Sequence, residues 1–408
     1  MLLETHIPQP GRSRVRWKGL AGAATAIYLA RSAANAATAI LLVARDAAEA
    51  SRLEEELRFF APADLPVLLF PGYETLPYDQ FSPHPDIISQ RLRTLALLPG
   101  LKRGIVVTDL PTALQRLPPR TFIDAHALAL RVGEELDLEA FRLRLTAAGY
   151  ASVPQVGEPG EFAIRGSLFD IFPMGSDLPL RIDLFDRQVD SVRSFDPETQ
   201  RSGDQFERLE LLPAREFSLG ADSIRDFRRR FRTRFEGDLT RMPLYRDVGD
   251  GLAPAGIEYY LPLYFDATTS LFDYLPRGAI VAVPADHEAT LVAAWSSIEE
   301  RFEERRYDIE HPVLAPAEVF ITPDDWRTAI SASLCLTLGG EASTEGGNAG
   351  IVVDLGSTAA PSLRLDQRRE ETVDAFAATL AAHPGRVLLA AESPGRRELL
   401  LDLLRPRG

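Results

Sequence analysis

The 408-residue sequence has a single cysteine, Cys335, and none of its apolar runs is long. One cysteine excludes an intramolecular disulfide. A helix that crosses a bilayer needs at least about 18 consecutive apolar residues, and no segment comes near that length. No signal-peptide pattern opens the chain, so we expect a cytoplasmic protein with no membrane contact. The net charge of −14 argues against a large phosphate-binding surface, although it allows a local basic patch.

The chain also has little of the chemistry that a nucleotide-hydrolysing enzyme needs. A phosphate-binding loop of the form G-x-x-x-x-G-K-[ST] holds phosphates with backbone amides and a lysine, and its Ser or Thr holds magnesium. All but two of the 45 basic residues are arginine, and neither Lys18 nor Lys102 precedes Ser or Thr. Residues 19–26 keep the frame of such a loop without its chemistry, with these residues at the key positions: Gly19, Gly22, Ala24, Thr25 and Ala26.

Other catalytic signatures are missing too. No Asp-Glu dipeptide is available to hold magnesium, and Asp286 and Glu288 after a predicted strand are the nearest remnant. The six histidines are scattered without metal-ligand spacing, and no serine lies in a G-x-S-x-G elbow. We therefore expect no catalytic residue, no metal and no cofactor. The alternative interpretation of residues 19–26 is an ordinary helix start rich in small residues.

The first 125 residues contain an alternation of buried strands and amphipathic helices. Short continuous apolar runs at 38–44, 66–70 and 104–108 are typical of strands covered on both faces. Helices are predicted between them, over residues 46–60 and 86–98. This alternation predicts an α/β fold with a parallel sheet and crossover helices.

Residues 126–213 differ from their surroundings and are predicted to form a β-rich α+β insertion. Asp137 caps a short helix, and short polar turns separate strands predicted at these segments: 128–132, 162–165, 168–172, 180–185 and 189–195. Helices then dominate again, with a buried strand at 279–283 and a charged helix over 296–306.

These patterns predict that the chain is divided into five parts. They are the first half of an α/β domain (1–125), the inserted domain (126–213), the second half of the first domain (214–340), a glycine-rich linker (341–350) and the start of another α/β segment (351–408). The last part is predicted to hold a helix over 370–382, a strand over 386–391 and a final helix from Ser393.

One strand of the insertion has an unusual polar face. In residues 180–185 (LRIDLF), alternate residues are aliphatic and suit the core, while Arg181, Asp183 and Phe185 share the opposite face. Arg165, in the strand predicted over 162–165, faces outward in the same way. Arginine beside an aromatic residue is typical of interface hot spots, so this face is a candidate partner-binding surface. The alternative is that Phe185 begins a turn and packs under a neighbouring loop.

A second basic feature is weaker. Residues 225–234 hold six arginines and two phenylalanines, a composition that occurs in nucleic-acid contacts. Because the chain is acidic overall, we interpret this segment as a solvated helical face.

Five longer stretches carry a resemblance to a known family. The chain is similar to the N-terminal, UvrB-homologous part of bacterial transcription-repair coupling factors in these segments, which run in the family's order: 73–95 (YETLPYDQFSPHPDIISQRLRTL), 157–175 (GEPGEFAIRGSLFDIFPMG), 180–196 (LRIDLFDRQVDSVRSFD), 255–265 (AGIEYYLPLYF) and 391–399 (AESPGRREL).

The resemblance implies a RecA-like domain 1 with a degenerate phosphate loop, split by an inserted domain 2 that binds the excinuclease subunit UvrA. The residues that match the family's UvrA contacts are Arg165, Arg181 and Phe185, and Asp183 shares their face. Residues 73–95 pass directly into a helix, so the resemblance leaves no room for the tyrosine-rich hairpin with which UvrB tests damaged DNA.

The family's polymerase-binding domain, ATP-driven translocase and C-terminal autoinhibitory domain match no part of this sequence. RNA polymerase and DNA are therefore expected to contact only domains outside it. We expect a non-catalytic adaptor that recruits UvrA to lesion-stalled transcription sites for nucleotide excision repair. Two alternatives remain: a module that restrains the motor by packing the inserted domain against the autoinhibitory domain, and, less favoured, a UvrB-like ATPase acting on damaged DNA.

Overall fold

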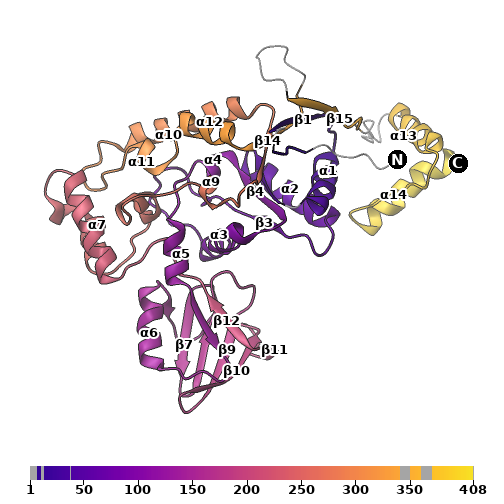
Figure 1. The fold of residues 1–408 in the computed structure, drawn as a ribbon. Coiled ribbons are helices and arrows are strands. Elements are labelled where there is room, and N and C mark those ends of the chain that lie inside the picture. The colour runs from indigo at the N-terminus through magenta and orange to yellow at the C-terminus, as the bar shows by residue number, and fades with distance from the viewer. Residues whose placement is uncertain (1–6, 11–12, 37, 341–349, 360–369, 408) are drawn as a thin grey trace. The chain divides into compact units, whose positions relative to one another are not determined.

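The chain forms two compact units, residues 1–356 and 357–408, which are described separately. The structure is a computed structural model, and it describes residues 7–10, 13–36, 38–340, 350–359 and 370–407 (Figure 1).

The first unit is built on a seven-stranded sheet in which all neighbouring strands are parallel. Every residue of β2 (Ala39–Ala44), β4 (Gly104–Asp109) and β13 (Ile280–Pro284) is buried, as expected for strands covered on both faces. The strand order is β15 (Ile351–Asp354), β1 (Arg14–Lys18), β14 (Leu334–Leu338), β13, β2, β4 and β3 (Val67–Leu69). The prediction of an α/β fold with a parallel sheet is confirmed.

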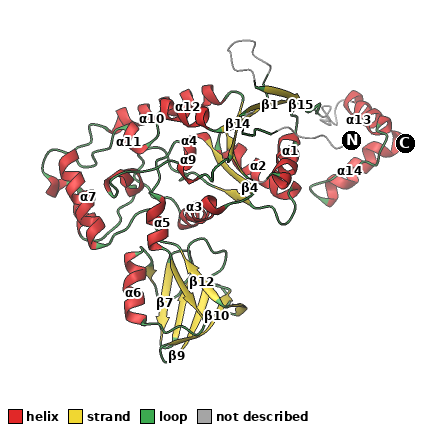
Figure 2. Cartoon of the chain, viewed as in Figure 1, coloured by secondary structure: helices red, strands yellow, loops and turns green. Residues whose placement is uncertain are grey.

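Helices cover both faces of this sheet (Figure 2). On one face, α1 (Ala24–Asn35) and α2 (Ala47–Phe60) bury their apolar stripes against alternate residues of the central strands. The other alternate residues face a second core with α3 and the helices that follow β4 and β13. The helices of that second core are α3 (Pro85–Leu97), α4 (Leu110–Ala113), α10 (His287–Arg305), α11 (Pro316–Val319) and α12 (Pro323–Ala332).

The remaining helices and 3₁₀ segments complete the parallel-sheet body. They are the 3₁₀ segment η1 (Leu98–Gly100), α5 (Arg120–His126), α7 (Ala221–Arg234), η2 (Leu239–Arg241), α8 (Pro243–Gly249), η3 (Ile257–Leu263) and α9 (Leu271–Tyr274).

A six-stranded sheet lies between the two halves of the parallel sheet in the sequence. Its strands are antiparallel except for β6 and β7, and α6 (Leu138–Ala147) covers its inner face, where Phe141 meets Phe169. The order is β11 (Ser202–Phe206), β10 (Gln188–Phe195), β9 (Leu180–Phe185), β8 (Leu168–Ile171), β7 (Glu161–Arg165) and β6 (Ala151–Ser152). β5 (Leu128–Arg131) and β12 (Arg208–Leu211) pair separately at the entry and exit of the insertion.

Helix α3 joins the inserted domain to the parallel sheet. Arg91 of α3 is fully buried, and its Nε lies 2.8 Å from Oε1 of Glu216, which follows the insertion. The Arg91 guanidinium also stacks on Tyr73, whose hydroxyl donates to the same carboxylate. Ser89, two residues earlier on α3, accepts a hydrogen bond from the Gly175 amide. Paired buried charges are costly to separate, so these contacts fix the base of the inserted domain.

The second unit contains α13 (Glu370–Ala382), α14 (Pro394–Leu404) and the short η4 (Arg405–Arg407). The strand predicted over 386–391 is wrong, because this segment pairs with no strand in the described chain and Leu388 is 92% exposed. No helix among the described residues has the length and apolarity needed to cross a bilayer.

Two boundaries in the first unit also differ from the prediction. Helix α10 begins at His287 rather than near residue 296, because Leu291 and Ile298, two turns apart, form its buried stripe. Residues 351–354, assigned to the last segment, instead extend the parallel sheet as β15 beside β1. The predicted linker lies almost wholly outside the described residues.

Candidate partner-binding surface

The outer face of the inserted sheet is organised around its central strand β9. The three aliphatic residues of β9 are at most 9% exposed, which turns Arg181, Asp183 and Phe185 to the opposite side. Arg165 ends β7 on the same side, two strands away. These four residues are hereafter called the outer face. The alternation predicted from the sequence is thus present in the strand.

Phe185 is the most exposed member of the outer face. Its side chain is 77% exposed, which contradicts the alternative that it packs under a loop. It pairs with Gln188 across a two-residue turn in which Asp186 has a φ of 56°. A phenylalanine held beside a tight turn has little freedom to fold back, so its ring stays available to another protein.

The two arginines share one buried carboxylate that the sequence analysis did not single out. Asp170 of β8 is 1% exposed in its side chain and receives Nη2 of Arg165 at 2.6 Å. Arg181 donates to the same carboxylate through Nε at 2.7 Å and Nη2 at 2.9 Å, and this pairing raises the pKa of Arg181. The signal for Asp170 was available, because it stands at an outward position between buried Phe169 and Ile171.

The two arginines are therefore not equivalent. The Arg181 side chain is 16% exposed, also donates to Gln200 Oε1 at 3.1 Å, and lies over the Phe195 ring at 4.6 Å. The Arg165 side chain is 47% exposed and gives only one nitrogen to Asp170. Asp183 accepts from the Ser191 hydroxyl at 2.9 Å. Arg165 and Phe185 are consequently the members of the outer face best placed to contact a partner.

The loop at residues 19–23 joins β1 to α1, as in a phosphate-binding frame. Gly19 and Gly22 have positive φ values of 65° and 55°, and Thr25 and Ala26 lie in the first turn of α1. A Cβ atom on Gly19 would come 2.5 Å from Oδ1 of Asp354, at the end of β15. An acidic side chain therefore borders this loop.

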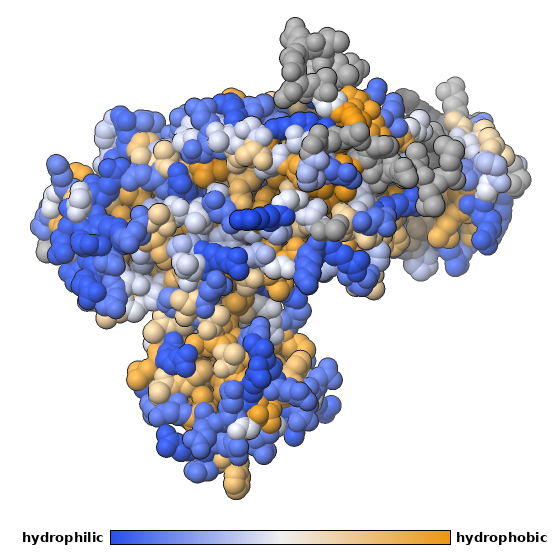
Figure 3. Space-filling view, viewed as in Figure 1, coloured by the Kyte–Doolittle hydropathy of each residue, from blue (hydrophilic) through white to orange (hydrophobic). Residues whose placement is uncertain are grey.

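The arginine-rich segment 225–234 lies on α7, where Phe227 and Phe231 form the buried stripe. Arg225 and Arg229 pair with acids one turn earlier on the same helix, and Arg234 pairs with Glu318. The α7 end of the first unit is accordingly hydrophilic in Figure 3. Local charge balance supports the interpretation as a solvated face.

Within the described part of the chain, no three His, Cys, Asp or Glu side chains gather closely enough to hold a metal ion. Cys335 is buried, and burial raises the pKa of its thiol.

Two sequence families match this chain. The UvrB interaction domain matches residues 128–217, which include the six-stranded sheet and the whole outer face, and the MFD, D3 domain matches residues 379–408.

Related proteins match most of the length of this chain. The transcription-repair-coupling factor of Escherichia coli (strain K12) is 38% identical over 387 residues, which cover 94% of this chain and 33% of that protein. The Haemophilus influenzae protein of the same name is 36% identical, over 90% of this chain and 32% of its own length. The Staphylococcus aureus (strain Mu50) protein is 29% identical over 67% of this chain and 24% of its own length. The chain thus spans about a third of the length of the first two relatives.

Proposed function

This chain is a relative of the transcription-repair-coupling factors that carries a UvrB interaction domain, and we propose that it is a non-catalytic adaptor that binds UvrA. In this proposal the inserted domain holds UvrA and so brings excision repair to stalled transcription. The observation that carries it is an exposed aromatic ring beside a partly free arginine, on the segment that the UvrB interaction domain matches.

The outer face suits a protein partner for a physical reason. The Phe185 ring would supply the apolar contact, and Arg165 would pair with a carboxylate or carbonyl oxygen of UvrA through its remaining nitrogens. Arg181 would act indirectly, because its pairing with Asp170 holds the sheet surface and the Arg165 side chain in place.

The parallel-sheet body is proposed to be a RecA-like domain that has lost nucleotide chemistry. Thr25 and Ala26 replace the lysine and hydroxyl residues that hold phosphate and magnesium. The Asp354 carboxylate, which pairs with Lys18, lies 2.5 Å from where a Cβ atom on Gly19 would be and narrows the loop. These features disfavour the ATPase alternative. The autoinhibitory alternative uses the same outer face, so the two functions would be alternating states of one surface.

The proposal is tested by titrating the chain into UvrA in a calorimeter. Phe185→Ala is expected to weaken binding about 30-fold, which corresponds to the roughly 2 kcal/mol lost at a central hot spot. The matched control is Phe59→Ala, which removes a ring that is 81% exposed on α2 of the body.

Equal losses in the two variants, or none in Phe185→Ala, would remove Phe185 from the site. A folded wild-type chain that does not bind UvrA would favour the autoinhibitory function instead. In that case, a separately produced C-terminal domain of a relative should bind the outer face, and Phe185→Ala should weaken that contact.

A further inference from the structure

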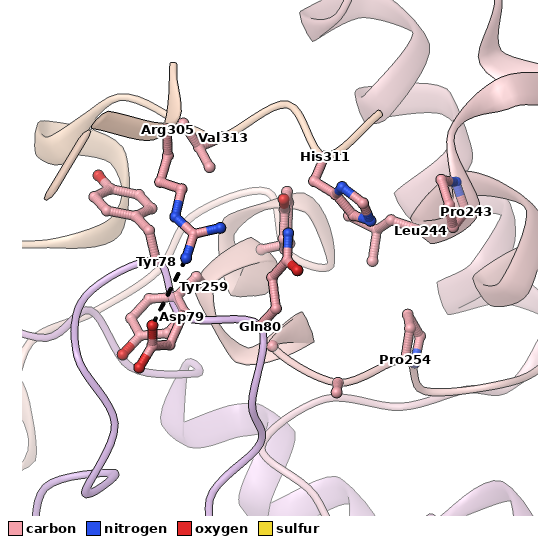
Figure 4. Close-up of a pocket in the computed structure, with 13 residues that line it drawn as sticks. Tyr78, Asp79, Gln80, Pro243, Leu244, Pro254, Tyr259, Arg305, His311 and Val313 are labelled. Carbon is pink, nitrogen blue, oxygen red and sulfur yellow. Dashed lines mark ion pairs between the residues drawn. The ribbon is translucent and has the colours of Figure 1, made fainter. Parts of the chain in front are cut away.

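A cavity of about 250 Å³ lies in the body of the first unit, and no residue of the inserted domain lines it (Figure 4). Its walls come from four segments: the loop before α3, the start of α8, the region around η3, and the end of α10 with the loop that follows. The apolar part of its lining includes Pro243, Leu244, Pro254, Tyr259 and Tyr260. Aromatic and apolar walls occur in sites that hold short peptide segments.

A cation with spare hydrogen-bonding capacity lines this cavity. Arg305, at the end of α10, comes no closer than 4.0 Å to Oδ1 of Asp79, toward which it points in Figure 4. That carboxylate is already used, because Arg301 Nη2 lies 2.9 Å from Oδ1 and the Leu76 amide donates to Oδ2. The Arg305 guanidinium therefore keeps donors for a second anionic group.

His311 adds a polar group across the cavity from Asp79 (Figure 4). Its Nδ1 lies 3.3 Å from Oδ2 of Asp308, so its Nε2 is the ring nitrogen left for another contact. One end of the cavity thus offers a guanidinium, and the other an imidazole, between apolar walls.

Three exposed apolar side chains are close in the sequence to residues that line the cavity. Phe81 is 70% exposed and follows lining residue Gln80, Leu252 is 60% exposed two residues before Pro254, and Ile309 is 79% exposed two residues before His311. Single exposed apolar residues need no explanation, but here three of them stand within two residues of a lining residue in the sequence.

We propose that this cavity binds a short peptide segment of a partner protein in which a carboxylate stands beside a large apolar side chain. The carboxylate would pair with Arg305, and the apolar side chain would enter between the tyrosine and proline walls. A nucleic-acid strand fits less well, because it carries a negative charge on every phosphate, whereas the peptide needs to place one carboxylate against Arg305. This site is separate from the outer face and does not rest on the proposed binding of UvrA.

The test uses the full chain and fluorescence anisotropy of fluorescein-labelled seven-residue peptides. The peptides carry Phe, Leu or Trp between two aspartates, flanked by Gly and Ser, and matched peptides carry asparagines instead. We expect a Kd of about 100 μM for at least one acidic peptide, as for a small transient contact. Asparagine peptides should bind at least tenfold more weakly.

Three variants locate the site. Arg305→Gln should weaken binding at least tenfold, and Ala255→Trp, at an exposed lining position, should abolish it by filling the cavity. Arg306→Gln is the matched control, because its side chain pairs with Glu303 outside the cavity, and it should bind as the wild type does. Phe185→Ala should also leave peptide binding unchanged, whatever its effect on UvrA.

Three results would overturn the proposal. One is the absence of binding by every acidic peptide at concentrations up to about 1 mM, roughly ten times the expected Kd. The second is peptide binding that Arg305→Gln and Ala255→Trp leave intact. The third is Arg305-dependent binding of a single-stranded oligonucleotide in place of the peptides.

Discussion

Asp170 shows how one buried carboxylate assigns different roles to two arginines at the residue scale. Its side chain is 1% exposed, so it needs a partner that stays with it. Arg181 supplies two hydrogen bonds from a mostly buried position, whereas Arg165 supplies one from a half-exposed position. The first arginine therefore stabilises the sheet, and the second remains open to a binding partner.

This difference predicts unequal costs for two similar substitutions. Arg181→Ala should destabilise the inserted sheet by about 3 kcal/mol, because it leaves a buried carboxylate poorly paired. Arg165→Ala should cost at most about 1 kcal/mol, as for an exposed ion pair. The three tryptophans lie outside the insertion, so the measurement is hydrogen exchange of peptides from β7 to β10.

Equal protection losses in the two variants would contradict the assignment of roles. The comparison also decides how binding data are interpreted. A loss of UvrA binding in Arg181→Ala is informative only after its fold has been measured, whereas a loss in Arg165→Ala reports on the contact directly.

The sequence predicted part of this arrangement and missed another part for a clear reason. Period-two alternation showed that Arg181, Asp183 and Phe185 share a face, because it depends only on strand geometry. It did not show that Arg181 is committed to Asp170, since that pairing depends on the register between β8 and β9. Cross-strand register is set by the whole sheet and is not contained in either strand alone.

At the scale of elements, the strands that are easiest to predict from the sequence are those whose burial is complete. β2 and β4 are short, almost continuous apolar runs, and the composition of such a run is enough to predict a buried strand. β1 (RVRWK) alternates basic and apolar residues, and β11 (SGDQF) is exposed along its whole length. These two strands exist because neighbouring strands supply hydrogen-bonding partners, which their own composition does not reveal.

The loop between α8 and η3 contains a glycine whose position depends on close packing. Gly256 has a φ of 82°, and a Cβ atom there would lie 2.5 Å from the Asp79 carbonyl oxygen and 3.0 Å from Gln80 Cα. Gly251 has a similar φ of 79°, but nothing lies within 4 Å of its Cβ position. An alanine at either position would have a similarly strained backbone. Only at position 256 would its Cβ atom also clash with neighbouring backbone atoms.

Gly251→Ala should therefore cost about 1 kcal/mol, from the left-handed backbone alone. Gly256→Ala should cost about 3 kcal/mol or more, because it must also push the backbone of residues 79 and 80 away. Urea unfolding followed by tryptophan fluorescence measures both values. Similar costs would show that the loop at 79–80 moves aside easily, and would remove close packing as the reason for glycine at 256.

At the scale of the whole molecule, Glu216 and Glu258 line one pocket together with residues of the parallel-sheet body and of the insertion. Glu258, in η3, accepts a hydrogen bond from Ser82 at 2.9 Å, and burial raises its pKa to about 7. Glu216, which pairs with Arg91 below the inserted domain, adds to this rise through its negative charge. Ionising Glu258 in the folded protein is thus unfavourable, whereas in the unfolded chain it ionises near pH 4.5.

Between about pH 4.5 and pH 7 the folded state therefore holds one more proton at Glu258 than the unfolded state does. Stability should fall as the pH rises through this window, by about 3 kcal/mol from this group, and the loss should be complete above pH 7.

Glu258→Gln keeps an oxygen that can accept from Ser82 but cannot ionise. The free energy of unfolding of this variant minus that of the wild type should therefore be constant below about pH 4.5, rise up to about pH 7 and then level off. Urea titrations at a series of pH values measure this difference. A flat line for Glu258→Gln would mean that the carboxylate is solvated in the folded protein and that its ionisation carries no cost to stability.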